Sequence, residues 1–387
     1  MTKAAVVSGY VAKGFEPVRD AFAGNLTERG DVGASFCLWH RGEPVVDIAG
    51  GDGGPDGAAY DDRTLQLVFS TTKGATAICV GMCVERGLID LDAPVATYWP
   101  EFASAGKGAV TVATLMSHSA GLPTIDARLT LDEALDWTTI TGHLAAQAPL
   151  WEPGTAHGYH ALTYGWLAGE LVRRVDGRSL GTFFADEVAK PLGLDFWIGL
   201  PAELEARVAP IIPAAPPSPE VAAMLAMVMG PDTLGGRALG LNGTFALDGI
   251  GFTWNRRDVH AAEIPAANGI TRAASLARMY AACIGEVDGV RLLSPAYVER
   301  ARRTLTSGAD RCLVAPTTFG IGFMTNGEFV KMSGPGSFGH AGAGGSLGFA
   351  DPERELAFGY VMNQMQNNLA DDPRVVALTE ASVACAG

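Results

Sequence analysis

The distribution of strand and helix signals along the chain is the feature that most constrains its fold. Residues with strand character gather near the two ends, at 34–49 and 319–362, whereas residues 70–300 show mainly helical patterns. We expect the ends to meet in one antiparallel sheet, flanked by terminal helices and carrying a helical insertion, which is an α+β fold of the α/β-sandwich kind. Residues 1–60 and 305–387 would form the sheet subdomain and residues 61–304 the helical subdomain, with a site at their interface.

Periodicity and turn residues locate the individual elements. Two strand-like runs, 34–40 and 44–49, flank Arg41-Gly42, a pattern typical of a hairpin. Further strands are expected at 319–323 and 355–362. Helices are expected at 15–29, 70–86, 162–174, 180–190, 221–229, 274–284 and 373–385.

Charge and composition exclude several classes of partner. The chain has 28 Lys and Arg against 42 Asp and Glu, a net charge of −14 that would repel nucleic acid and an anionic membrane surface. No apolar run is long enough for a transmembrane helix or a signal-peptide core. Six scattered cysteines without a Cys-x-x-Cys motif favour a reduced, cytoplasmic protein. The oligomeric state is left open.

Ser70-Thr71-Thr72-Lys73 is the first segment that indicates chemistry. It opens an amphipathic helix, and a spacing of three brings the amine of Lys73 to the same face as the hydroxyl of Ser70. The helix N-terminus favours negative charge developing on Ser70, and burial would lower the proton affinity of Lys73. A second Ser-x-x-Lys, Ser104 to Lys107, has no helical stripe behind it and is treated as coincidental.

Two further segments complete a candidate catalytic set. Tyr159 follows a Pro-Gly turn and precedes a predicted helix, which makes it a candidate general base whose phenol is acidified by Lys73. The glycine-rich run from Gly339 to Ser346 would let a substrate approach backbone N–H groups closely.

Together these segments resemble the serine β-lactamase and penicillin-binding-protein superfamily, in its class C-like branch with the family VIII carboxylesterases. The resemblance covers nearly the whole chain and rests on residues 69–73, 115–123, 153–159, 191–194, 339–342 and 348–352. It implies a soluble serine hydrolase that needs no metal or cofactor and acts on a small-molecule ester or amide.

The resemblance also implies a role for each site residue. Ser70 would form an acyl-enzyme while Lys73 and Tyr159 share the proton transfers, and the N–H groups of Ser70 and Ala343 would form the oxyanion hole. Substrate contacts are expected from His340, Ala341, Gly342 and Asn268.

Two departures from the lactamase pattern point toward neutral, small esters. Lactamases carry Tyr-x-Asn where this chain has Tyr159-His160-Ala161, and a Lys-Thr-Gly-like motif where it has His340-Ala341-Gly342. The amide that holds an acylamido group and the fixed cation for a carboxylate are both lost.

Other interpretations remain beside the esterase. β-Lactamase, D-aminopeptidase and acyltransferase activities belong to the same superfamily, and an inert binding module is the non-enzyme alternative. Ser346 lies in a Gly-x-Ser-x-Gly motif but has no histidine downstream, so a nucleophile elbow is not expected. His118 is expected to be structural. The apolar run 224–229 fits either core or the wall of an acyl pocket.

Overall fold

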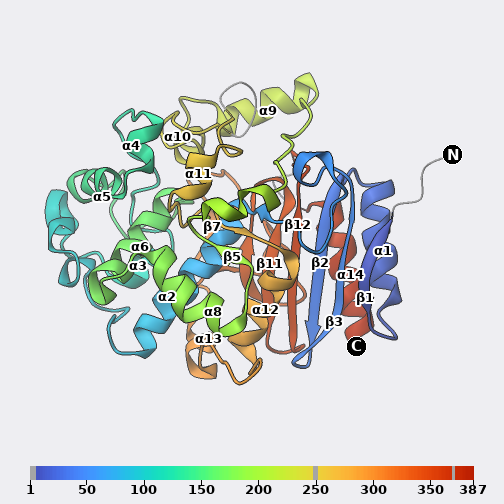
Figure 1. Ribbon diagram of the computed structural model, residues 1–387. Helices are drawn as coiled ribbons and strands as arrows, with labels where there is room; N and C mark the ends of the chain where they lie inside the picture. The colour runs from blue at the N-terminus through green and yellow to red at the C-terminus, as the bar shows by residue number, and fades with distance from the viewer. Residues whose placement is uncertain (1–5, 247–251, 368–370) are drawn as a thin grey trace.

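The two ends of the chain form one sheet. The computed structural model describes residues 6–246, 252–367 and 371–387, and its main sheet has the antiparallel order β1-β3-β2-β12-β11-β10-β9-β8-β7 (Figure 1). Its strands are β1 (Val7–Val11), β2 (Gly33–His40), β3 (Glu43–Gly51), β7 (Thr306–Ala309), β8 (Pro316–Phe319), β9 (Met324–Thr325), β10 (Phe338–Ala341), β11 (Leu347–Asp351) and β12 (Leu356–Met362). The predicted α+β fold is confirmed.

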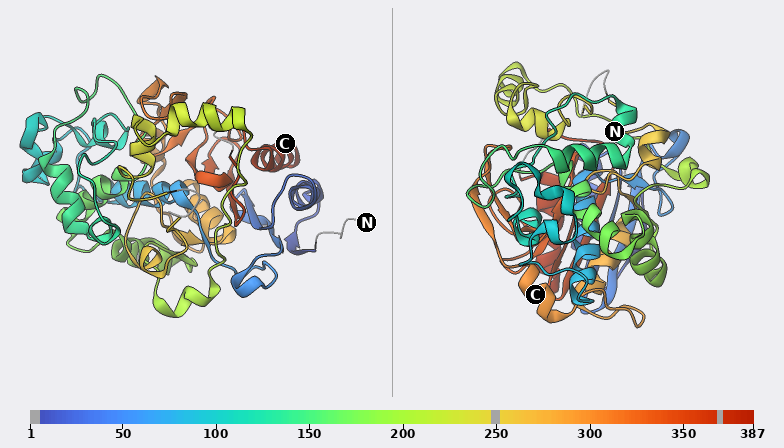
Figure 2. Two further views of the ribbon diagram at one scale, coloured as in Figure 1. Left: turned by 90° about the horizontal axis from the view of Figure 1, so that it is seen from above. Right: turned by 90° about the vertical axis from the view of Figure 1, so that its left-hand side faces the viewer.

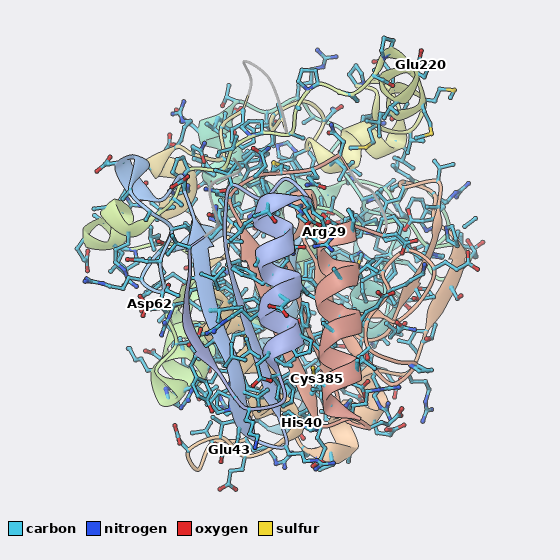
Figure 3. All side chains as sticks on the ribbon, turned by 90° about the vertical axis from the view of Figure 1, so that its right-hand side faces the viewer. Arg29, His40, Glu43, Asp62, Glu220 and Cys385 are labelled. Carbon is cyan, nitrogen blue, oxygen red and sulfur yellow. The ribbon has the colours of Figure 1, made fainter. Side chains whose placement is uncertain are left out.

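The ends meet where β2 pairs with β12. Phe36 lies opposite Tyr360 and Leu38 opposite Phe358 in the register, and the rings of Phe36 and Phe358 pack edge to face at 4.9 Å. Alternate side chains of these strands are buried against α1 (Glu16–Thr27) and α14 (Pro373–Ala386), which lie side by side on one face of the sheet (Figure 3). The opposite face is covered by α12 (Ala273–Ile284).

The predicted hairpin is confirmed as β2 and β3. Arg41 and Gly42 both have positive φ, 53° and 79°, and His40 pairs with Glu43 across them. A two-residue turn with both central residues in this region matches the right-handed twist of the flanking strands.

The middle of the chain is mainly helical (Figure 2). Its helices are α2 (Thr72–Glu85), α3 (Val112–Met116), α4 (Leu131–Leu135), α5 (Trp137–Ala146), α6 (Thr163–Asp176), α7 (Leu180–Phe184), α8 (Lys190–Leu192), α9 (Pro219–Met229), α10 (Leu234–Leu239), α11 (Arg257–Ala261), α12 and α13 (Pro295–Ala301). A small sheet of β4 (Gln66–Leu67), β6 (Ile270–Thr271) and β5 (Phe196–Trp197) lies among them. Because α12 packs on the main sheet, the division at residues 60 and 304 stays a prediction.

Three predicted elements differ from the structure. Of the strand expected at 319–323, only Phe319 lies in a strand, at the end of β8. The rest is the turn before β9, where Gly322 has φ 79° and an added Cβ would lie 2.5 Å from the hydroxyl oxygen of Tyr164. The helix expected at 180–190 is α7, a π-helical turn (Ala185–Ala189) and α8. The helix expected from Ser70 begins as a 3₁₀ turn, Phe69–Thr71, and becomes α-helical at Thr72.

Within the described residues no helix has the length and apolar character needed to cross a membrane. All six cysteines are free thiols, five of them buried.

Candidate active site

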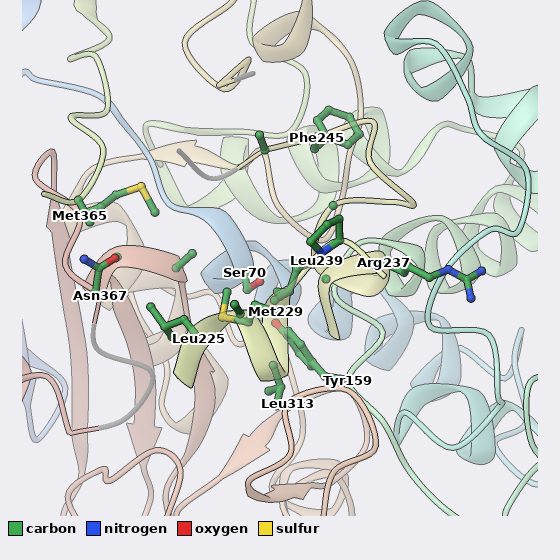
Figure 4. A pocket seen from close by; sticks show the side chains of 18 of the residues that line it. Ser70, Tyr159, Leu225, Met229, Arg237, Leu239, Phe245, Leu313, Met365 and Asn367 are labelled. Carbon is green, nitrogen blue, oxygen red and sulfur yellow. The ribbon is translucent and has the colours of Figure 1, made fainter. Parts of the chain in front are cut away.

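A cavity of about 1080 Å³ opens beside the start of α2 (Figure 4). Ser70 and Tyr159 line it together with Ala341, Gly342 and Ala343, which end β10 and begin the following turn. The fold therefore brings together five of the residues that the sequence singles out. Most of the remaining lining is apolar, with Leu225, Met229, Phe245, Leu313 and Met365 among its side chains.

The backbone before Ser70 is strained and firmly held. Phe69 has φ 44°, a left-handed conformation that L-residues with bulky side chains rarely adopt and that is often found at functional sites. Thr72 stabilises this turn, since its hydroxyl donates to the carbonyl of Phe69 (2.6 Å) and accepts from the N–H of Gly269 (2.8 Å). Ser70 is thus fixed at the end of β4 with its side chain in the cavity.

Lys73 lies directly behind Ser70. Its side chain is fully buried, and Nζ lies 3.0 Å from Ser70 Oγ, 2.6 Å from the carbonyl oxygen of Ala161 and 3.0 Å from that of Ala266. Burial holds the pKa of the Lys73 amine well below its ordinary value. The amine thus lies within hydrogen-bond distance of three oxygen atoms: two backbone carbonyls, which can only accept, and the hydroxyl of Ser70.

Tyr159 completes the group around Ser70. Burial raises the pKa of its phenol, an effect that the hydrogen bond with the side chain of Ser70 partly offsets. Lys73 Nζ lies 4.7 Å from the centre of the Tyr159 ring, yet the phenol is not acidified as the sequence analysis expected, because desolvation dominates. The phenol therefore keeps its proton and can donate it.

Asp310, which no sequence motif singles out, holds the backbone of Tyr159. Its buried Oδ1 accepts the N–H groups of Tyr159 (3.0 Å), Cys312 (2.8 Å) and Leu313 (2.9 Å), and Oδ2 accepts the hydroxyl of Thr317 (3.0 Å). One carboxylate thus fixes the loop before α6 to the connection between β7 and β8. No local pattern predicts this, because the partners are 151 residues apart.

The N–H groups of Ser70 and Ala343 both lie in the first turn of a 3₁₀ segment, where backbone donors lack an intrahelical acceptor. Arg374 anchors the turn at Ala343. Its side chain is fully buried and donates a hydrogen bond to the carbonyl of Gly344. Arg374 also pairs with Asp31 (2.8 Å) and Asp372 (2.7 Å). The candidate oxyanion hole therefore rests on a buried ionic network.

The structure does not bring His340 and Asn268 to the cavity. Asn268 is buried, and its amide donates to the carbonyls of Val259 (2.8 Å) and Ala262 (2.6 Å) while accepting the N–H of Ile264 (2.9 Å). Its amide shapes the loop that carries Ala266 instead of facing a substrate. His340 is also buried, and its Nδ1 donates to the carbonyl of Ala341 (2.7 Å).

His340 is neutral in this environment. Burial lowers the pKa of its imidazole well below the ordinary value, and a proton on the nearby Lys73 amine would lower it further. Its ring stacks against the ring of Tyr159, with centroids 5.9 Å apart, and so helps to hold the Tyr159 side chain in place.

The other serine motifs have structural contacts. Ser346 is buried and donates to the carbonyl of Val68 (2.9 Å), which ties β11 to the turn before Ser70. In the second Ser-x-x-Lys, Lys107 Nζ contacts the carbonyl of Ser104 (2.8 Å), whereas Lys73 contacts the hydroxyl of Ser70. His118 accepts the N–H of His160 at Nδ1 (3.0 Å) within the buried aromatic cluster.

A serine hydroxyl beside a lysine amine of lowered pKa can become a nucleophile without a histidine, and here the serine of that pair lines a substrate-sized cavity. The protein is accordingly a serine hydrolase. The sequence model of the Beta-lactamase family matches residues 18–381, and the chain belongs to this family.

Its relatives include proteins named as esterases. The "Esterase/beta-lactamase LipL" of Mycobacterium tuberculosis is 37% identical over 364 residues, covering 92% of this chain and 82% of that protein. A solved family VIII carboxylesterase is 40% identical with a TM-score of 0.88, covering 98% of this chain and all of the other. EstA from Arthrobacter nitroguajacolicus Rue61a is 34% identical with a TM-score of 0.86 and the same coverage.

Proposed function

We propose that the protein hydrolyses carboxylic esters through an acyl-enzyme on Ser70. The observation that carries the proposal is the position of Lys73, whose amine is buried, bound to two carbonyls and directed at Ser70 Oγ. The lowered pKa of Lys73 supports its role as the base that takes the proton of Ser70.

The steps follow from this assignment. Ser70 Oγ attacks the ester carbonyl carbon as its proton passes to Lys73 Nζ, and the N–H groups of Ser70 and Ala343 stabilise the oxyanion. The bond to the alcohol oxygen then breaks, and Tyr159 delivers a proton to that oxygen while Lys73 returns one to the phenol. Water attacks the acyl-enzyme by the same route and releases the carboxylic acid.

The surroundings of Tyr159 favour esters over β-lactams. Ala161 offers only a backbone carbonyl, which Lys73 occupies, and His340 is buried and neutral, so neither supplies a contact for an acylamido group or a carboxylate. The guanidinium of Arg237, which also lines the cavity, points away from Ser70 and pairs with Asp126 (Figure 4).

Comparison of two substrates tests this preference. We predict that kcat/KM for a p-nitrophenyl ester exceeds that for a chromogenic cephalosporin by at least roughly a hundredfold, which is about 2.7 kcal/mol of transition-state stabilisation. Equal or faster turnover of the cephalosporin would replace the esterase assignment by the lactamase one.

A second candidate is β-lactam hydrolysis, favoured by the exposed guanidinium of Arg128 on the cavity lining. If that activity is substantial, Arg128→Ala should raise KM for the cephalosporin and leave KM for a neutral ester unaltered. A cytoplasmic location also remains a proposal, supported by the six free cysteines.

A further inference from the structure

Helix α9 forms an apolar wall of the active-site cavity at the edge of the molecule (Figures 1 and 2). Its only charged residue is Glu220, in the first turn, at the outer end seen in Figure 3. Leu225 and Met229 point to the cavity side (Figure 4) and line it, whereas Met227, 74% exposed, does not. One side of α9 therefore lines the cavity that contains Ser70, and the other side does not.

Apolar side chains outside α9 line the cavity as well. Phe245, Leu313, Met324 and Met365 are among them. Of the two arginines that line the cavity, Arg237 pairs with Asp126 outside it, and Arg128 is exposed. A ligand in contact with these side chains and with Leu225 and Met229 would gain chiefly from the burial of hydrocarbon.

The size of the cavity exceeds what a small ester needs. Its volume of about 1080 Å³ lies just above the range, roughly 300–1,000 Å³, of pockets that enclose drug-sized molecules. An acetyl or butyryl ester would leave most of the apolar wall in contact with water. The cavity therefore has room for a larger ester than the small one that the sequence favours.

We propose that the substrate is an ester with a long or bulky apolar group, and that this group packs against Leu225 and Met229 of α9. The inference rests on the proposed function, because it concerns the substrate of the same Ser70. Each methylene buried against this wall should raise kcat/KM by roughly three- to fourfold until the wall is covered.

Two series of esters test the proposal, each at concentrations at which the ester is dissolved as single molecules. One lengthens the acyl group of p-nitrophenyl esters from two to ten carbons, and the other lengthens the alcohol of acetate esters, so that the two sources of the apolar group are separated. In at least one series, kcat/KM should rise tenfold or more with chain length. Rates that stay flat or fall in both series, with activity still abolished in Ser70→Ala, would overturn this inference alone. Wild-type rates in Ser70→Ala would instead overturn the proposed function.

Variants of α9 supply the matched control. Leu225→Asn should lower the ratio of long-chain to short-chain kcat/KM by at least roughly fivefold, whereas Met227→Asn on the outer side should leave it unchanged. Met229→Gln serves the same purpose if circular dichroism shows that Leu225→Asn is misfolded. Equal effects of the inner and outer substitutions would contradict the proposal, because packing of substrate on the cavity side would then not be the cause.

Discussion

Burial lowers the pKa of the Lys73 amine, and among the described residues no carboxylate forms an ion pair with it. Protonated Lys73 cannot accept the proton of Ser70, so the neutral fraction sets the rate of acylation. We predict that kcat/KM for an ester is lost as pH falls through the lowered pKa of Lys73 and is retained well below pH 10.5, the ordinary value for lysine.

Lys73→Arg checks which group is responsible for this profile. A guanidinium stays charged throughout the accessible range, so this variant should lose about a hundredfold or more in kcat at every pH. A Lys73→Arg enzyme with the wild-type rate and pH profile would assign the titration to another group. The buried histidines His118 and His340 are poor alternatives, since burial lowers the pKa of each.

Single residues differ in how far sequence could predict them. Ser70, Lys73 and Tyr159 are found by local spacing and by the turns around them, because a helix places residues three apart on one face. The burial of Asn268 could not be predicted, since its amide is used by a loop whose conformation depends on tertiary packing. Asp310 was missed for the same reason.

At the scale of elements, α14 supports the turn that carries Ala343. Arg374 in the first turn of α14 has no exposed surface, and its guanidinium contacts Asp31, Asp372 and the carbonyl of Gly344. Removing one partner of such a network leaves buried charges unpaired, which is strongly destabilising.

Arg374→Met is therefore expected to lower the free energy of unfolding by about 3–5 kcal/mol, measured by urea denaturation. It should also lower kcat, because the carbonyl of Gly344 loses its anchor. Lys331→Met is the matched control: it removes a surface pair with Asp371 and should cost less than about 1 kcal/mol. Similar losses in both variants would show that the buried network does not stabilise this turn.

Elements with a strong apolar period were predicted well, and a segment whose course is set by a tertiary contact was not. The helices α6 and α12 follow the expected apolar spacing, and both lie almost where the sequence places them. The strand expected at 319–323 failed because Gly322 approaches Tyr164 too closely for any side chain and turns the chain between β8 and β9.

At the scale of the whole molecule, strand signals at both ends were enough to predict one antiparallel sheet, because strands at the two ends can bury their apolar faces only by pairing. The cavity could not be predicted in the same way. Its lining runs from Ser70 to Asn367, so its volume and apolar character appear only once these segments are folded together.

The measurement that tests the account most directly is the mass of the enzyme after reaction with a fluorophosphonate or a slowly hydrolysed ester. We predict a single adduct, which peptide digestion maps to Ser70. The Ser70→Ala variant should show neither this adduct nor ester hydrolysis. Ser104→Ala, which alters the other Ser-x-x-Lys, should be labelled and active like the wild type. An adduct on a different serine, or turnover by Ser70→Ala within tenfold of the wild-type rate, would contradict the assignment of Ser70 as the nucleophile.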